Sequence, residues 1–263
     1  MSEHRRLIRW FAALALVAAG AAPVRAADGA QALVEASDRI RNPAQPFRVT
    51  ARLVEYRSGK PHDTSSLRLY SKASGEGGRF RNLASYLEPT ADVGKALLMQ
   101  DRIMWFYDPA SSASVRVSPQ QRLVGQASIG DVMTVDFTRD YKAATVGEET
   151  IPDADNKPRA VVHLNLVATS DAAIYSRIEY WVEKDSSFPV KGRFYADSGR
   201  ALKVAYWRKP APQLGMVRPT EVVILDEVDP TVLTRLGFSD YHAMEIPDSW
   251  FQRDWLSHLQ AAP

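Results

Sequence analysis

The chain has 263 residues, and its 33 basic and 31 acidic residues nearly balance, so its charge gives no sign of nucleic-acid binding. It contains no cysteine, which excludes disulfides, thiolate metal sites, cysteine nucleophiles and an acyl-cysteine lipid anchor. A chain of this length without disulfides must be held together by its own hydrophobic core.

The first 26 residues have the pattern of an export signal. A basic segment, Glu3–Arg9, precedes an uncharged, alanine-rich apolar run, Trp10–Ala22, and Val24-Arg25-Ala26 has small residues where a signal peptidase cuts. The run is too short to span a bilayer comfortably, and no second long apolar run follows. We predict that residues 1–26 are a cleaved signal peptide and that residues 27–263 form one soluble exported domain. The alternative is a membrane anchor that is never cut.

A helix and three strands are expected next. Apolar residues recur with helical spacing over Asp28–Ile40, and Asn42-Pro43 ends that helix. Alternating apolar and polar residues predict strands and turns of an up-and-down antiparallel sheet. The strands are expected over Phe47–Tyr56, Ser66–Ser71 and Arg79–Leu87, with turns at Ser58-Gly59-Lys60 and at Gly75, Gly77 and Gly78.

The segment Ala96–Val117 consists of three short runs separated by turn residues, which predicts three consecutive antiparallel strands. The middle run, Ile103–Tyr107, is apolar at every position, so both of its faces need cover. We expect it to be a central strand of a curved sheet with other residues packed inside the curve. An ordinary core strand of an all-β domain is the alternative.

The strand pattern stops at Leu123–Asp140, whose apolar residues do not alternate and predict one or two short helices with a loop lying across the sheet. Strand signals resume over Tyr141–Glu149, Ala160–Ala168, Arg177–Glu183, Val190–Ala196, Leu202–Trp207, Pro219–Leu225 and, weakly, Thr231–Phe238. Asp248 can cap a final helix, on which Phe251, Trp255 and Leu259 share a face. No linker or repeat interrupts this order, so we expect one domain of roughly a dozen antiparallel strands.

Short motifs are spread over most of the chain that follows the signal. They are Tyr86-x-x-Pro89, Gly94-Lys95-Ala96-Leu97-Leu98, Met104-Trp105-Phe106-Tyr107-Asp108-Pro109, Ser128-x-Gly130-Asp131, Asp140-Tyr141, Tyr175-x-Arg177-Ile178-x-x-Trp181-Val182, Pro189-Val190-Lys191, Ser198-Gly199-Arg200-x-Leu202-Lys203, Arg218-Pro219 and Trp250-Phe251. In this order they resemble the outer-membrane lipoprotein-sorting family, a branch of the LolA-like periplasmic carriers. The resemblance implies a mainly β fold with a few helices: a curved, incomplete antiparallel β-barrel of roughly 11–13 strands with helices covering the concave face.

The resemblance also implies that the concave face takes up acyl chains beneath a movable lid. The apolar residues expected to line it are Leu53, Leu69, Phe80, Leu98, Trp105, Tyr107, Tyr180, Phe194 and Tyr206. The lid candidates are Ile129, Val132 and Met133. In LolA-like carriers an arginine on an early strand helps hold the lid shut, and we assign that role to Arg81, with Arg79 as the second choice. Each residue alone has an ordinary structural explanation, so the prediction concerns the set.

We therefore expect a monomeric periplasmic carrier that shelters acyl chains of lipoproteins or free lipids and delivers them toward the outer membrane. An inner-membrane transporter and an outer-membrane acceptor are the expected partners. The alternatives are a lipid- or lipoprotein-sensing module that works with an inner-membrane transporter or signalling partner and, less favoured, a hydrolase.

Enzyme signals are weak. The histidines of the chain after the signal, His62, His163, His242 and His258, form no metal-binding motif. The segment Gly125–Gly130 has a glycine one residue too far from its serine for a nucleophile elbow. No covalent chemistry, metal or cofactor is expected.

Overall fold

The computed structural model describes the whole chain apart from residues 1–22, 76–77, 101, 172, 230 and 262–263. Most of the predicted signal peptide and part of the glycine-rich turn after Gly75 therefore lie outside the described residues. Among the residues described, no helix is both long enough and apolar enough to cross a membrane. The first element, α1 (Pro23–Arg41), contains the helix predicted over residues 28–40.

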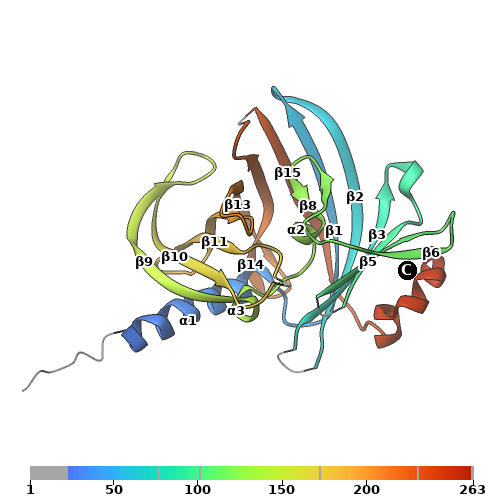
Figure 1. Ribbon diagram of the computed structural model, residues 1–263, viewed down its shortest axis with the longest axis horizontal. Helices are drawn as coiled ribbons and strands as arrows, with labels where there is room; N and C mark the ends of the chain where they lie inside the picture. The colour runs from blue at the N-terminus through green and yellow to red at the C-terminus, as the bar shows by residue number, and fades with distance from the viewer. Residues whose placement is uncertain (1–22, 76–77, 101, 172, 230, 262–263) are drawn as a thin grey trace, which may run out of the picture.

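Within the described residues, thirteen strands form one antiparallel sheet, in the order β6-β5-β4-β3-β2-β1-β15-β14-β13-β12-β11-β10-β9. They are β1 (Phe47–Arg57), β2 (Lys60–Ala73), β3 (Phe80–Glu88), β4 (Ala96–Gln100), β5 (Ile103–Asp108), β6 (Ala113–Val117), β9 (Tyr141–Pro152), β10 (Pro158–Ala168), β11 (Arg177–Glu183), β12 (Pro189–Tyr195), β13 (Ala201–Gln213), β14 (Met216–Asp226) and β15 (Val232–Ala243). The pairing of β1 with β15 joins an N-terminal half, β1–β6, to a C-terminal half, β9–β15. Figure 1 shows a strongly curved sheet whose edge strands, β6 and β9, do not pair in the part of the chain described. The predicted fold class, a curved and incomplete antiparallel barrel, is confirmed.

Strand β1 shows why these segments form strands. Phe47, Val49 and Ala51 are each at most 2% exposed and alternate with polar residues whose side chains reach solvent. The turn into β2 places Ser58 and Gly59 at φ values of 48° and 77°, the left-handed conformation that a two-residue hairpin turn requires. The sequence pattern and the backbone geometry therefore agree along this hairpin.

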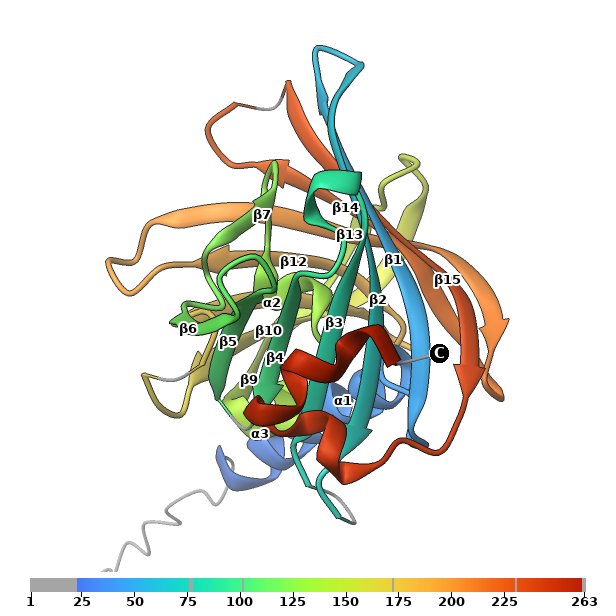
Figure 2. The ribbon, with the colours of Figure 1, turned by 90° about the vertical axis from the view of Figure 1, so that its right-hand side faces the viewer.

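Several short elements connect the strands. The helix η1 (Thr90–Asp92) precedes β4, and the segment between β6 and β9 forms a small hairpin, β7 (Arg122–Val124) and β8 (Ala127–Ser128), followed by two short helices, α2 (Ile129–Val132) and α3 (Phe137–Asp140). The two helices confirm the prediction for residues 123–140, whereas the hairpin was not predicted. Figure 2 shows α2 inside the curve of the sheet, and α1 packs against α3 and β9.

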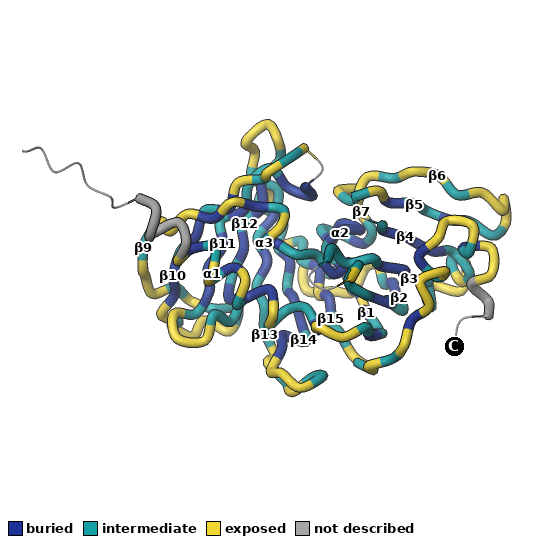
Figure 3. The backbone as a smooth tube through the Cα atoms, turned by 90° about the horizontal axis from the view of Figure 1, so that it is seen from below, coloured by how far each residue is buried: buried dark blue, intermediate teal, exposed yellow. Residues whose placement is uncertain are grey.

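The main core fills the concave side of the sheet. It draws on both halves and on the segment between β6 and β9, residues 118–140, which we call the crossing segment. Examples are Leu53, Leu97, Leu164 and Ile129. In Figure 3 buried segments run through both halves of the sheet and through α2 between them. The crossing segment is therefore part of the packed interior.

The run Ile103–Tyr107 does not occupy the predicted central position, because β5 is second from one edge of the sheet. Its two faces are nevertheless both covered. Met104 and Phe106 pack into the main core, whereas Trp105 and Tyr107 pack on the opposite face. The continuous apolar run thus reflects two packed faces and not a place at the centre of the sheet.

The opposite, convex face of β2–β5 is covered by the end of the chain, η2 (Asp248–Phe251) and η3 (Arg253–Ala261) (Figure 2). We call the residues packed there the outer cluster: Tyr70, Leu83, Ala96, Leu98, Tyr107, Ile246, Phe251 and Leu256. Asp248 does not cap a helix as predicted, since Pro247 holds the cap position and Asp248 forms ion pairs with Lys72 and Arg81. The side chain of Leu259 lies outside the described residues.

Candidate functional site: an apolar cavity beneath a helical lid

A cavity of about 110 Å³ lies inside the curve of the sheet. Most of its wall is apolar and comes from β1, β2, β12, β13, β14, β15 and the crossing segment. The lining residues include Phe47, Val49, Leu69, Val132, Met133, Phe137, Ile174, Tyr175, Phe194, Ala205, Trp207, Val222, Ile224, Leu236, Phe238 and Tyr241. Pockets for small-molecule ligands commonly measure roughly 300–1,000 Å³. The space is thus too small for a long acyl chain unless part of its wall moves.

One part of the wall lies outside the main sheet, the segment Ile129–Asp140, and we call it the lid segment. Val132 and Met133 line the cavity and are at most 4% exposed. The segment begins where Ser128 and Asp131 form a capping box at the start of α2: the backbone N–H of Ser128 donates to Asp131 Oδ2 at 2.7 Å. No strand of the main sheet runs through the lid segment, so its position depends on side-chain packing and polar contacts.

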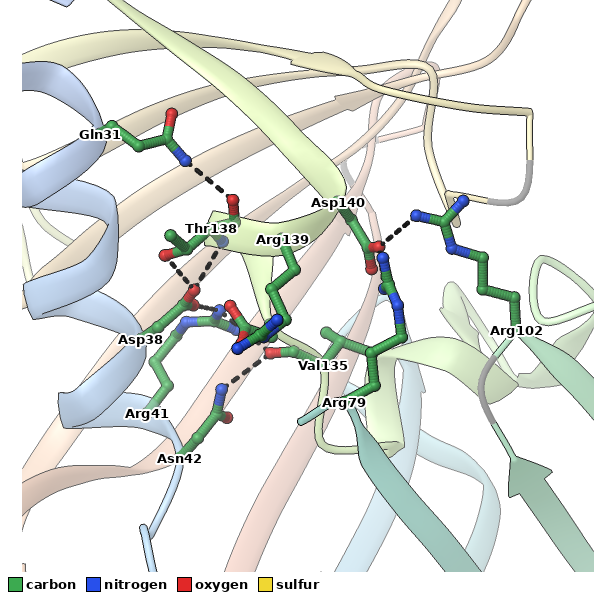
Figure 4. A network of polar contacts seen from close by, with 11 residues as sticks. Gln31, Asp38, Arg41, Asn42, Arg79, Arg102, Val135, Thr138, Arg139 and Asp140 are labelled. Atoms are coloured by element: carbon green, nitrogen blue, oxygen red, sulfur yellow. Dashed lines mark hydrogen bonds and ion pairs between the residues drawn. The ribbon is translucent and has the colours of Figure 1, made fainter. Parts of the chain in front are cut away.

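On one side, α1 holds the lid segment through hydrogen bonds (Figure 4). Asp38 Oδ2 accepts from the backbone N–H of Thr138 at 2.7 Å and from its hydroxyl at 2.8 Å. Asn42 Nδ2 donates to the carbonyl of Val135 at 2.8 Å, and Gln31 Nε2 donates to the carbonyl of Thr138 at 2.8 Å. These bonds satisfy backbone groups at the ends of two very short helices.

On the other side, the N-terminal half of the sheet holds the lid segment by two kinds of contact. Asn82 of β3, which is fully buried, donates to the carbonyl of Thr134 at 3.1 Å and accepts from its N–H at 3.0 Å. Asp140 forms ion pairs with Arg79, just before β3, and with Arg102 Nη2 at 3.0 Å (Figure 4). The lid segment is therefore tied to the sheet by separable polar contacts, which suits an element that opens.

Asp136 lies between the two short helices, where burial and the neighbouring Asp38 carboxylate raise its pKa to about 7. Arg139 Nε, 3.0 Å from Asp136 Oδ2, opposes this shift. A carboxyl that gains or loses its proton around neutral pH thus sits at the contact between α1 and the lid segment.

Comparison with known proteins places this geometry in a family. The model of a protein family described as "uncharacterized protein" matches residues 78–258. The chain belongs to this family. A search of curated proteins gives no match.

Solved structures show the same fold. A LolA superfamily protein from Nitrosomonas europaea is 29% identical, with a TM-score of 0.76 over 86% of this chain and 98% of that one. A putative outer membrane lipoprotein-sorting protein domain from Vibrio parahaemolyticus is 18% identical, with a TM-score of 0.74 over 88% and 99%. A DUF1329 family protein from Desulfovibrio piger is 22% identical, with a TM-score of 0.75 over 88% and 99%. These similarities confirm the LolA-like identification.

In this LolA-like chain, four of the predicted site residues lie together at the cavity: Leu69, Phe194, Val132 and Met133. Leu53, Ile129 and Tyr180 belong to the main core but not to the cavity wall. Phe80 borders a separate space of about 30 Å³ beside Arg79 and Asp140.

The other predicted lining residues lie elsewhere. Leu98, Trp105 and Tyr107 are packed on the convex face, against the C-terminal helices. Tyr206 alternates with the inward-facing Trp207, so it points to the opposite side of β13. The predicted alternation is therefore out of phase for β4, β5 and β13, and the proposed lining set becomes the one given above.

The expected lid arginine also needs correction. Arg81 pairs with Asp248 at 2.8 Å and lies 5.0 Å from the centre of the Phe251 ring, so it contacts the C-terminal helix. Of the two predicted candidates, Arg79 is the one that contacts the lid segment, through Asp140. The anchors Asp38, Asn82 and Asp140 were not predicted. Of these three, only Asn82 could have been found from the sequence. It is a polar residue at an inward position of β3, between Phe80 and Ala84, and a buried polar side chain needs a hydrogen-bond partner.

Proposed function

We propose that this chain is an exported periplasmic carrier that shelters acyl chains of lipoproteins or lipids in the cavity and delivers them toward the outer membrane. The observation that carries this proposal is an apolar cavity closed by a segment tied to the sheet by separable polar contacts. The names of the similar structures, a LolA superfamily protein and an outer membrane lipoprotein-sorting domain, support the same role. An inner-membrane donor and an outer-membrane acceptor are the partners that such a role requires.

The physical need for a carrier is large. Each methylene of an acyl chain exposed to water costs roughly 0.8 kcal/mol, so a long chain does not cross an aqueous compartment unprotected. A cavity that enlarges when its lid segment moves provides cover without covalent chemistry. In the closed form Val132 and Met133 fill space that the cargo takes up after opening.

A reversible disulfide between the lid segment and the sheet tests the proposal. Because the chain has no native cysteine, two introduced cysteines can pair only with each other within the molecule. The double variant Asn82→Cys with Thr134→Cys links β3 to the lid segment where the two residues already contact each other. When oxidised, it is expected to keep its circular dichroism spectrum but not take up an environment-sensitive apolar dye. After reduction the same sample is expected to bind the dye and to release it to a fatty acid.

Each single-cysteine variant is the control, because it loses the same hydrogen bonds without forming the link. Dye uptake by the oxidised double variant equal to that of the reduced form would remove the lid segment from the mechanism. Failure of every form to bind the dye would show that the cavity does not take up apolar molecules, which contradicts the proposed function.

A further inference from the structure

A polar cluster interrupts the apolar wall of the cavity. It consists of Ser128 and Asp131 at the start of α2, Tyr175 in the loop before β11, and Lys203 of β13. The hydroxyl of Tyr175 donates to Asp131 Oδ1 at 2.7 Å, and that of Ser128 donates to Asp131 Oδ2 at 2.9 Å. Lys203 Nζ forms an ion pair with Asp131 Oδ2. Asp131 and Tyr175 both line the cavity.

Lys203 is buried in an apolar setting. It is 4% exposed, and its Nζ lies 5.0 Å from the centre of the Tyr175 ring and 5.7 Å from that of Phe194, both of which line the cavity. Desolvation by burial lowers the pKa of Lys203, against the raising effect of Asp131. A buried ion pair adds little to stability compared with apolar packing, so the presence of the Lys203–Asp131 pair, of which Asp131 lines the cavity, calls for another explanation.

The two charges of this ion pair lie on different elements, which move apart when the lid segment opens. Asp131 is in the lid segment and Lys203 is in the sheet, so movement of the lid segment takes away the carboxylate. Among the described residues, Asp131 is the only acidic residue that forms an ion pair with Lys203. An ammonium group left buried beside Tyr175 and Phe194 of the cavity wall without an anion is strongly unfavourable, so opening favours a ligand that brings its own negative charge.

We propose that Lys203, together with the hydroxyl of Tyr175, binds the anionic head of the amphiphile that fills the cavity, and that Asp131 occupies this position in the closed form. This inference rests on the proposed carrier function and narrows its cargo. A free carboxylate and a phosphate headgroup both supply the required charge, whereas the ester and amide carbonyls that attach acyl chains to a lipoprotein are neutral. The site therefore favours a free anionic lipid.

The test compares ligands that share one chain and differ in the head: oleate, oleoyl lysophosphatidate and uncharged oleyl alcohol. Their affinities are measured by displacement of an apolar dye. Wild-type protein is expected to bind at least one anion more tightly than the alcohol. Asp131→Asn frees Lys203 from its partner and is expected to increase this preference about tenfold, the usual scale of a charge-assisted hydrogen bond.

The double variant Asp131→Asn with Lys203→Met removes both charges, which avoids leaving one charge buried alone, and is expected to lose the preference. Lys191→Met, on a lysine whose Nζ lies 4.8 Å from the centre of the Trp181 ring, is the matched control and is expected to keep it. A stronger preference for oleate indicates a fatty acid, and one for lysophosphatidate indicates a phospholipid; either supports the site. A preference that survives in the double variant, or equal affinity for anion and alcohol in wild type, overturns the inference but not the carrier function. Binding of none of the three overturns both.

Discussion

Asp136 shows how a single side chain can affect the stability of the closed form, in which the lid segment covers the cavity. Its carboxyl faces Asp38 and Arg41 of α1 and Arg139 of α3, and its pKa is raised from 3.8 to about 7, chiefly by burial and then by Asp38. When the lid segment opens, this carboxyl becomes solvated and its pKa returns toward the ordinary value. The closed form therefore binds a proton that the open form releases.

The sign of the pH dependence follows. A raised pKa in the closed form stabilises that form fully below pH 3.8, and the stabilisation is lost as the pH rises through about 7. Amide hydrogen exchange of residues 132–140, corrected for the intrinsic effect of pH, is expected to be faster at pH 8 than at pH 5. In Asp136→Asn, which stays neutral, the two rates are expected to be equal. Equal rates in the wild-type protein would show that Asp136 does not titrate in this range.

Asn82 is the second single residue on which the position of the lid segment depends, because it makes both hydrogen bonds to the backbone of Thr134. Replacement by alanine leaves the buried N–H and carbonyl of Thr134 without partners, at a cost of about 2 kcal/mol. Urea unfolding is expected to show this loss in Asn82→Ala, whereas Asn165→Ala on β10, whose contact with Arg177 is a long 3.4 Å, is expected to cost much less. Equal losses in the two variants would contradict the anchoring role of Asn82.

In the proposed mechanism, elements outside the sheet, above all the lid segment, determine how the cavity opens. Asp140 ties α3 to Arg79 and Arg102, and Asp248 ties the C-terminal helices to Lys72 and Arg81 on the opposite face. Each carboxylate thus has two cationic partners, but only Asp140 lies on the lid segment. The two residues therefore form a matched pair for mutation.

Asp140→Asn is expected to speed uptake of an apolar dye in stopped-flow mixing. Loss of about 1 kcal/mol of ion-pair energy corresponds to about fivefold faster opening. Asp248→Asn is expected to leave the uptake rate unchanged, because its contacts lie on the convex face. Faster uptake in both variants would indicate a general loosening of the fold instead of release of the lid.

The sequence predicted the strands well and their faces less well. Alternation in β1 determined which side chains point inward, because only one face of that strand is strongly apolar. In β4 and β5 both faces are packed, one by the main core and one by the C-terminal helices. Because both faces are apolar, the sequence pattern did not indicate which side chains point into the curve of the sheet. The anchors of the lid segment were not predicted because their partners are far apart in sequence, as in the pair of Asp38 and Thr138.

At the scale of the whole molecule, the pairing of β1 with β15 makes one continuous sheet of two halves, and the lid segment bridges them inside the curve. It contacts β3 through Thr134 and β13 through Asp131. The predicted signal cleavage after Ala26 falls in the first turn of α1 and leaves Gln31, Asp38 and Asn42, which hold the lid segment, on the mature chain. Export and closure of the cavity are therefore compatible.

The central claim is that the exported protein carries acyl-containing molecules in the cavity. The direct measurement is native mass spectrometry of the protein purified from the periplasm, followed by extraction and identification of what it holds. We predict a chain that lacks residues 1–26 and has a lipid or lipoprotein acyl group bound, with the bound fraction lost when the cavity is blocked by Val222→Glu, which places a charge in its wall. A periplasmic protein that carries no acyl compound, or one whose bound lipid is the same in Val222→Glu, would contradict the account.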